Sequence, residues 1–296
     1  MAKTVTEDPR TKGPKPEPEF PQKPQSEPGT EAEMTPKADH GEGSYRGSDR
    51  LKDRVAVITG GDSGIGRAVA LAFAREGADV VIAYLNEHED ARESERLVKE
   101  AGRRALLIDG DISERGKCEE IVERAFREFG RIDVLVNNAA YQPVKESIAE
   151  FTDDEFDRAM KTNVYAMFWI CRSAVPRMKP GSAIINVASI QAYEPTPNLL
   201  PYSTTKGAIV TFTKGLAKML AKEGIRVNAV APGPVWTPLI PATLPAEKVK
   251  TFGSNTPMER PGQPAELAPA FVFLASNESS YITGEVIGVT GGRPLP

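Results

Sequence analysis

The residues best suited to chemistry lie in one short stretch, from Ser189 to Lys206. Tyr202 and Lys206 are four residues apart, so a helix of about 3.6 residues per turn places both on one face. A phenol normally ionises near pH ~10, and a cation close to it favours the phenolate and lowers that pKa. Because proton transfer works best with a pKa near the working pH, the pair predicts a neutral-pH acid/base unit.

Ser189 follows an apolar run, Ala183–Ala188, that predicts a buried strand. Its hydroxyl is therefore expected at the carboxyl end of that strand, where open α/β sheets bind their ligands. A tyrosine and a lysine at this spacing also occur by chance on solvated helices, so the catalytic interpretation needs support from the rest of the chain.

Composition excludes several classes of protein. The net charge of −4 and the lack of a long basic run argue against a nucleic-acid partner. No apolar run reaches the roughly 18 residues of a membrane span, and the N-terminus lacks a secretory apolar segment. Cys118 and Cys171 are scattered, which indicates a reducing, cytoplasmic compartment. With only His40 and His88, we expect no metal site.

Residues 1–50 differ in composition from the remainder of the chain. They carry eight of the 25 prolines and almost no large apolar residues, so they cannot bury enough surface to fold alone. We expect an extended or disordered N-terminal arm, either a solubilising tail or an arm laid across a neighbouring subunit through Phe20, Met34 and Tyr45. Residues 51–296 are sufficient for one α/β domain.

A glycine-rich turn follows the first predicted strand. The β-branched run Arg54–Thr59 leads into Gly60–Gly66, and helical periodicity follows over residues 67–74. Glycine allows close approach of the backbone to a pyrophosphate, and a helix N-terminus favours the anion. The order of strand, turn and helix predicts dinucleotide binding, although a glycine-rich turn without a ligand is the alternative.

The ends of two further predicted strands bear on the ligand. After the strand over residues 79–84, Tyr84, Leu85 and Asn86 stand where NAD enzymes often place an acid for the ribose hydroxyls, and no arginine is present for a 2′-phosphate. The strand over residues 131–136 ends in Asn137–Ala140, whose small residues permit close approach of a ring or ribose, or else form a tight turn.

The alternation of predicted strands and helices indicates a doubly wound parallel sheet. The remaining strands are predicted over residues 104–108, 183–188, 224–231 and 286–289. Helices are predicted over residues 88–101, 113–129, 152–178, 208–220 and 264–275. Ser113 is the predicted N-cap of the second helix, and a break is predicted near Thr162-Asn163 in the third. Residues 232–262 are too long for a plain connector and suit a lid. The helices over 164–178 and 208–220 are apolar on almost every face, which predicts a subunit interface.

The ordered set of motifs resembles the short-chain dehydrogenase/reductase family. The residues that carry the resemblance are Thr59–Gly66, Asn137–Ala140, Asn163, Ser189, Tyr202 with Lys206, and Pro232-Gly233. Ala140 departs from the glycine that is more usual there. The family implies a Rossmann-type sheet of about seven strands, a homotetramer and helices on both faces. The Pro-rich leader and the segment Tyr84–Asp90 resemble a bacterial general-stress branch related to glucose/ribitol dehydrogenases.

The resemblance implies a role for each matching residue. Tyr202 is the general acid/base, Lys206 lowers its pKa and binds the nicotinamide ribose, and Ser189 polarises the substrate carbonyl. Asn163 holds a water that relays protons to Lys206. The cofactor-binding residues implied are Gly60, Ser63, Gly64, Ile65, Gly66, Tyr84, Leu85, Asn86, Asp111, Ile112, Asn138, Ala139, Ala140, Tyr202, Lys206, Pro232, Gly233, Val235 and Thr237.

These observations favour an NAD(P)(H)-dependent oxidoreductase that interconverts a small carbonyl compound, such as an aldehyde, ketone or sugar, and an alcohol. The expected cofactor is NADP or NAD, with a preference for NADP, and the predicted pocket includes Gln142, Gln191, Tyr193, Trp236 and Leu239. The alternatives are a dinucleotide-binding stress or scaffold protein with little turnover, and an isomerase or dehydratase that recycles its cofactor.

Overall fold

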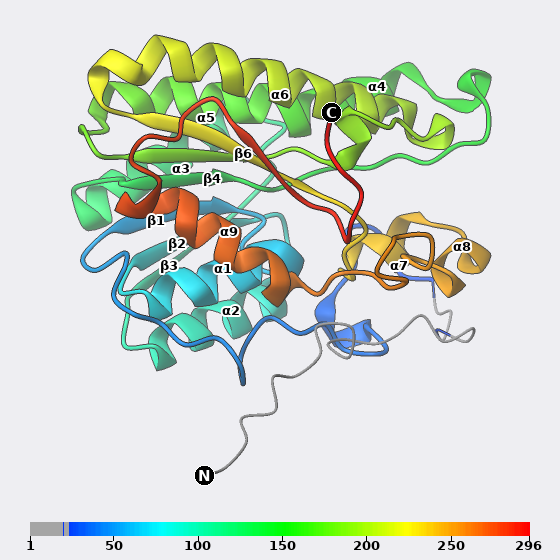
Figure 1. Ribbon diagram of the computed structural model, residues 1–296, viewed down its shortest axis with the longest axis horizontal. Helices are drawn as coiled ribbons and strands as arrows, with labels where there is room; N and C mark the ends of the chain where they lie inside the picture. The colour runs from blue at the N-terminus through cyan, green and yellow to red at the C-terminus, as the bar shows by residue number, and fades with distance from the viewer. Residues whose placement is uncertain (1–19, 21–23) are drawn as a thin grey trace.

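The structure is a computed structural model that describes residue 20 and residues 24–296. Its centre is a parallel sheet of seven strands in the order β3-β2-β1-β4-β5-β6-β7 (Figure 1). The strands are β1 (Val55–Thr59), β2 (Asp79–Tyr84), β3 (Ala105–Asp109), β4 (Val134–Asn137), β5 (Ala183–Val187), β6 (Arg226–Pro232) and β7 (Val286–Val289). The predicted Rossmann-type doubly wound sheet is confirmed.

Strand order places a crevice at the middle of the sheet. From β1 the chain proceeds to β2 and β3 on one side, and then returns to β4, which pairs with β1 through Val57 and Leu135. At such a reversal the connections leave in opposite directions beyond the carboxyl ends of the strands, and ligands bind in the gap. Every residue of β1, β2, β4 and β5 is buried, as expected for strands covered on both faces.

Helices cover both faces of the sheet (Figure 1). One face carries α1 (Gly64–Arg75), α2 (His88–Glu100) and α9 (Pro264–Ala275); the other carries α3 (Arg115–Phe129), α5 (Ala166–Ala174) and α6 (Leu200–Leu220). Beyond the sheet lie α4 (Asp153–Met160), α7 (Leu239–Thr243) and α8 (Ala246–Lys250). Short 3-10 turns span Glu31–Glu33, Ile148–Glu150, Val175–Arg177, Ile190–Ala192, Pro197–Leu199, Ala221–Glu223 and Asn277–Ser279.

Several boundaries differ from the predicted ones. Ser113 does not cap α3, because Asp111 accepts a hydrogen bond from the Ser113 amide at 2.8 Å and the resulting turn delays the helix to Arg115. The helix expected over residues 152–178 is interrupted near Thr162-Asn163, as predicted, by a π-helical turn over Lys161–Tyr165. The segment predicted as a lid, residues 232–262, includes the short helices α7 and α8.

The described part of the N-terminal arm packs on its own domain. Phe20 and Met34 are buried in a cluster with Trp236 of the lid. The Tyr45 hydroxyl donates a hydrogen bond to Glu76 at 2.6 Å. All three residues suggested as anchors for a neighbouring subunit therefore contact the same chain. Residues 1–19 and 21–23, where much of the Pro-rich sequence falls, lie outside the described residues.

Candidate active site

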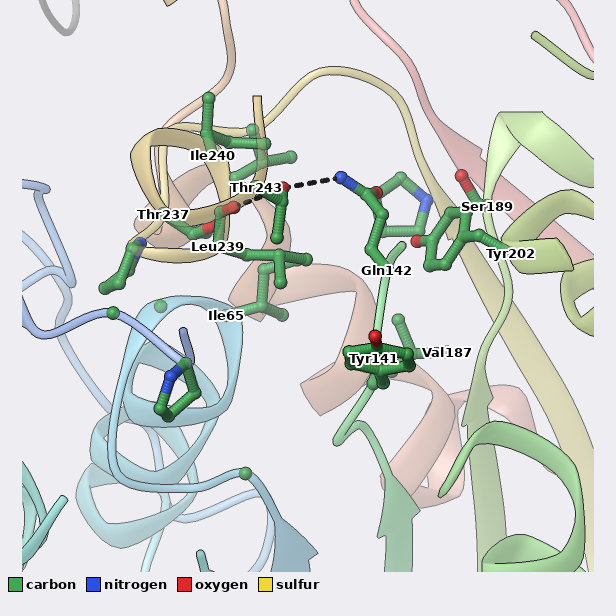
Figure 2. Close-up of a pocket in the computed structure, with 18 of the residues that line it drawn as sticks. Ile65, Tyr141, Gln142, Val187, Ser189, Tyr202, Thr237, Leu239, Ile240 and Thr243 are labelled. Carbon is green, nitrogen blue, oxygen red and sulfur yellow. Dashed lines mark hydrogen bonds between the residues drawn. The ribbon is translucent and has the colours of Figure 1, made fainter. Parts of the chain in front are cut away.

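A cavity of about 600 Å³ lies at the crevice between β1 and β4. In Figure 2 its two sides face each other, with Ile65 of α1 on one side and Ser189 and Tyr202 on the other. The predicted site residues that line it are Gly60, Ser63, Gly64, Ile65, Tyr84, Leu85, Asp111, Ile112, Asn138, Ala139, Ala140, Ser189, Tyr202, Lys206, Pro232, Gly233, Val235 and Thr237. Gly66, Asn86 and Asn163 do not line it.

Ser189, Tyr202 and Lys206 meet where β5 leads into α6. Ser189 follows β5 directly and is buried, while its hydroxyl accepts the Gln191 amide at 3.1 Å. Lys206 is one turn beyond Tyr202 on α6, with its ammonium nitrogen 5.1 Å from the centre of the Tyr202 ring. The same nitrogen donates to the Val187 carbonyl oxygen at 2.7 Å. The three predicted catalytic side chains are thus brought together at one end of the cavity.

Burial, rather than mutual attraction, governs the pKa values of the Tyr202–Lys206 pair. It raises the pKa of Tyr202 to about 12, against the opposite effect of a hydrogen bond with Ser189. It lowers the pKa of Lys206 to about 7. The expectation that Lys206 lowers the Tyr202 pKa is therefore wrong for this structure. Both groups are desolvated, and the lysine nitrogen lies over the ring and bonds a carbonyl, so desolvation outweighs any charge effect.

Asn163 lies behind the cavity, on the π-helical turn. Its side chain accepts the Tyr141 amide at 2.8 Å and donates to the Tyr141 carbonyl at 2.9 Å. It also donates to the Thr205 hydroxyl at 3.0 Å, and that hydroxyl donates to the Tyr202 carbonyl at 2.6 Å. Asn163 therefore fixes the loop after β4 to the first turns of α6. A π turn makes the helix bulge locally, and such turns are frequent at functional sites. Here the bulge places the Asn163 side chain between the loop after β4 and α6.

The glycine-rich turn connects β1 to the start of α1. Gly60 has a φ of 63°, and a Cβ atom there would lie 3.1 Å from the Ala139 Cα. At Gly66 a Cβ atom would lie only 1.8 Å from the Gly60 carbonyl oxygen, so Gly66 allows the helix to pack against the turn. The amides of Ile65 and Gly66 have no hydrogen-bond partner among the described residues, as expected of a helix N-terminus that binds an anion.

The end of β4 is tied to this turn by hydrogen bonds. The Asn138 side chain donates to the Thr59 and Gly60 carbonyls at 2.9 and 3.0 Å. The Thr59 hydroxyl accepts the amides of Asn138 and Ala139 at 3.0 and 3.1 Å. The two sides of the crevice are therefore held in a fixed relation, with small residues facing the cavity between them.

Acidic groups lie near the end of β2, where the sequence analysis found none. Asp62 and Glu87 both line the cavity. Burial, together with the charge of Glu87, raises the pKa of Asp62 to about 7. One Glu87 carboxylate oxygen is buried without a hydrogen-bond partner among the described residues. Asn86, predicted to bind the cofactor here, is exposed instead and does not line the cavity.

The lid closes over the catalytic end of the cavity. The Gln142 side chain donates to the Thr243 hydroxyl of α7 at 3.0 Å, a bond that Figure 2 shows beside Tyr202. Of the predicted pocket residues, Gln142, Gln191 and Leu239 line the cavity. Tyr193 and Trp236 do not: Tyr193 packs against the core, and Trp236 is buried beneath the arm against Phe20.

Sequence reasoning missed the contribution of the arm to the site. Glu27, Pro28 and Gly29 line the cavity. The buried Glu31 carboxylate accepts a hydrogen bond from the Gly64 amide at the start of α1, at 2.8 Å. It also forms a hydrogen bond with the His40 ring at 2.8 Å. The arm has no periodic pattern, so hydrophobic periodicity could not predict these contacts. The pair of an acid and a histidine in an otherwise apolar-poor segment was the one available signal.

Comparison with known proteins identifies the family. Residues 60–293 match the family model described as "Enoyl-(Acyl carrier protein) reductase". Together with the ordered motifs and the fold, this match shows that the chain belongs to the short-chain dehydrogenase/reductase family of oxidoreductases. Among the described residues, no helix has the length and apolar character needed to cross a membrane.

Named relatives match almost the whole chain. General stress protein 39 of Bacillus subtilis is 53% identical over 276 residues, which cover 93% of this chain and 96% of the relative. Glucose and ribitol dehydrogenase of Daucus carota is 46% identical over 278 residues, covering 92% and 96%. A crystal structure of a short chain dehydrogenase from Burkholderia cenocepacia in complex with NADP has a TM-score of 0.78 at 30% identity, covering 82% of this chain and 98% of that chain.

Proposed function

We propose that this protein interconverts a small aldehyde, ketone or sugar and the corresponding alcohol, with NADP or NAD as the hydride carrier. The observation that carries the proposal is the meeting of Ser189, Tyr202 and Lys206 at one end of a cavity whose other side is a glycine-rich helix N-terminus. The carrot relative named as a glucose and ribitol dehydrogenase supports the same reaction class.

The residues present fit a dinucleotide. The amides of Ile65 and Gly66 suit its phosphates, and the small residues Ala139 and Ala140 leave space beside the turn. Asp111 and Ile112 line the adenine end that the resemblance implies, and Pro232, Gly233, Val235 and Thr237 line the cavity where the resemblance implies the nicotinamide. The neighbour solved with NADP supports a preference for that cofactor, while Glu87 would disfavour a 2′-phosphate.

In carbonyl reduction, Tyr202 would donate its phenolic proton to the carbonyl oxygen, because a pKa of about 12 keeps the phenol protonated at neutral pH. Ser189 would donate a hydrogen bond to the same oxygen and stabilise the charge that develops there. Lys206, with a pKa of about 7, can gain or lose a proton near neutrality and so suits reprotonation of the site. A bound nicotinamide supplies the hydride.

Replacement of one hydroxyl tests this proposal. Tyr202→Phe should lower kcat by about 10²–10⁴-fold, because it removes the proton donor, while cofactor affinity stays within about twofold. Turnover is followed by absorbance of the reduced cofactor, with NADP(H), NAD(H) and a panel of aldehydes, ketones and sugar alcohols, and affinity is measured by calorimetry. Tyr193→Phe is the matched control, since Tyr193 does not line the cavity.

Other outcomes point to other functions. Full turnover by Tyr202→Phe would refute the assignment of Tyr202. Tight dinucleotide binding by the unaltered protein, without turnover of any substrate, would favour the stress or scaffold alternative. Product formation without a stoichiometric change in the reduced cofactor would favour an isomerase or dehydratase that recycles it.

We also propose that the protein is a cytoplasmic homo-oligomer, specifically a tetramer. Tyr165, Phe168 and Met219 are exposed large apolar residues on or beside α5 and α6, the helices predicted to form a subunit interface. A second copy of this face would bury them. The free thiols Cys118 and Cys171 agree with a reducing compartment.

A further inference from the structure

A turn of the N-terminal arm forms part of the cavity wall. The Gly29 amide donates to the Ser26 carbonyl at 2.8 Å, which places Glu27 and Pro28 at the tip of the turn. Gly29 has a φ of 83°, and a Cβ atom there would lie 2.6 Å from the Pro238 carbonyl oxygen of the lid. Only glycine fits this contact without displacing the lid, so the tip is held against the lid closely.

Further contacts fix the arm to the lid on both sides of this turn. The Gln25 amide donates to the Pro241 carbonyl at 3.1 Å. The Trp236 indole donates to the Pro36 carbonyl at 2.9 Å and stacks on Phe20, with ring centres 4.7 Å apart. Because its neighbours are anchored in this way, Glu27 belongs to the ordered wall of the cavity.

Glu27 faces a cation across the cavity wall. Its carboxylate lies 4.0 Å from the Arg158 guanidinium of α4, and both residues line the cavity. Arg158 lies over the ring of Tyr141, 4.2 Å from its centre. Tyr141 adjoins Gln142, which lies beside Ser189 and Tyr202 in Figure 2. Through Tyr141, the charged pair thus contacts the loop that carries Gln142 into the cavity.

The Glu27 carboxylate keeps its hydrogen-bonding capacity, whereas the Arg158 guanidinium also hydrogen-bonds to the Tyr141 side chain. Among the described residues, the Glu27 carboxylate makes no hydrogen bond, and its ion pair with Arg158 is a long one. Burial raises the pKa of Glu27, although the charge of Arg158 acts in the opposite direction. A carboxylate that accepts and a guanidinium that donates, a few ångströms apart, match adjacent hydroxyl groups, since each hydroxyl can do both.

We propose that Glu27 and Arg158 bind adjacent hydroxyl groups of a polyhydroxylated substrate whose reacting carbon lies at Ser189 and Tyr202. This inference rests on the proposed function and assigns the choice of substrate partly to the N-terminal arm. The Glu27 and Arg158 side chains are 37% and 48% exposed. A substrate without hydroxyl groups would therefore leave them hydrogen-bonded to water, whereas adjacent hydroxyl groups would gain hydrogen bonds from both. A substrate with an anionic group at this position would pair with Arg158 but would be repelled by the Glu27 carboxylate.

Two five-carbon alcohols test the inference, namely ribitol, which is hydroxylated along its length, and 1-pentanol, which has a single hydroxyl. We expect a higher kcat/KM for ribitol in the unaltered protein. Glu27→Ala should lower kcat/KM for ribitol by about 10–100-fold, mainly through KM, and change that for 1-pentanol by less than about twofold. Glu27→Gln, which can still hydrogen-bond, should recover part of the loss.

Controls separate substrate binding from a structural effect. Glu33→Ala alters an exposed acid of the same arm and should leave both alcohols unchanged. Arg158→Met should reproduce the loss for ribitol, and the double variant with Glu27→Ala should lose less than the sum, because both residues contact the same substrate groups. Equal losses for both alcohols, or no loss for either, would overturn the inference while leaving the proposed function intact.

Calorimetric binding of ribitol to the protein saturated with NADPH, which cannot accept a hydride from an alcohol, gives a result that does not depend on turnover. We expect binding by the unaltered protein and by Glu33→Ala, and a loss of about tenfold or more in affinity for Glu27→Ala. Equal affinity in Glu27→Ala, or no binding by the unaltered protein, would overturn the inference. Ribitol binding without turnover of any carbonyl or alcohol would instead count against the proposed function alone.

Discussion

Tyr202 and Lys206 are both buried, and burial moves their pKa values in opposite directions, to about 12 and about 7. The phenol therefore retains its proton at neutral pH, which suits a proton donor in carbonyl reduction. The amine is held neutral for a larger part of the pH range than an exposed lysine. One hydrogen bond with the Val187 carbonyl and contact with the Tyr202 ring fix its position.

Near the end of β2, where the resemblance implies the adenosine ribose, one residue provides a test of cofactor choice. Glu87→Gln removes a negative charge beside Tyr84 and Leu85 but retains the size of the side chain. We expect kcat/KM for NADP to rise relative to that for NAD by about fivefold to tenfold, because a 2′-phosphate is no longer repelled. The ratio is measured with saturating alcohol substrate. Glu89→Gln on the exposed side of α2 is the control, and an unchanged ratio in Glu87→Gln would contradict the prediction.

At the scale of elements, the arm is connected to the start of α1. Glu31 accepts the Gly64 amide and His40, and its own amide donates to Asp90 at 2.9 Å. Arg67 of α1 forms an ion pair with Asp90 at 3.2 Å. The segment that precedes the domain in sequence therefore satisfies one of the free amides at the N-terminus of α1, next to those of Ile65 and Gly66.

The buried His40 makes this connection dependent on pH. Burial lowers the pKa of His40, and the charge of Arg67 acts in the same direction. Hydrogen bonds with Glu31 and Glu42 together outweigh both effects, so the pKa is raised above 6.5. A raised folded-state pKa gives stability that is complete below about pH 6.5 and is lost as pH rises through the folded-state value. The protein should therefore become less stable from mildly acidic to alkaline pH through this residue.

Replacement of the histidine should remove that dependence. His40→Asn is expected to reduce the fall in Tm between about pH 6 and pH 9, because the raised folded-state pKa of His40 is its source. Thermal unfolding followed by circular dichroism measures the change. His88→Asn is the control, since His88 is exposed on α2. The same pH dependence in His40→Asn and the unaltered protein would show that His40 is not its source.

At the scale of the molecule, α4, α5 and α6 lie together along one edge (Figure 1). Exposed apolar side chains gather on these helices: Phe156, Tyr165, Phe168 and Met219 are between 43% and 71% exposed. Within the described chain, neither the arm nor a loop covers them. This exposed apolar set supports the proposal that a second copy of the chain covers it.

Charged residues on this face should disrupt assembly. The double variant Phe168→Glu and Met219→Glu should shift the mass measured by light scattering from a tetramer to a dimer or monomer, because association would bury unpaired charges. Ile148→Glu, a change at an exposed apolar residue outside these helices, should leave the mass unchanged. A monomeric unaltered protein, or an unchanged mass for the double variant, would refute the proposed interface.

The sequence by itself determined the doubly wound sheet and the grouping of Ser189, Tyr202 and Lys206. These depend on local patterns: strand and helix periods, the glycine-rich turn, and a four-residue spacing on α6. Strand order then requires the ends of β1, β4 and β5 to meet, so the motifs that follow those strands had to converge.

Only the tertiary structure decided the pKa values and the role of the arm. The Tyr202 pKa depends on how many atoms exclude water from the phenol, and a spacing of four residues carries no information about that. The contacts of Glu27, Glu31 and Trp236 join segments separated by 33 to 200 positions in the sequence, without periodicity in the arm to predict them. Burial and long-range pairing are properties of the assembled molecule, which is why they could not be predicted from local pattern.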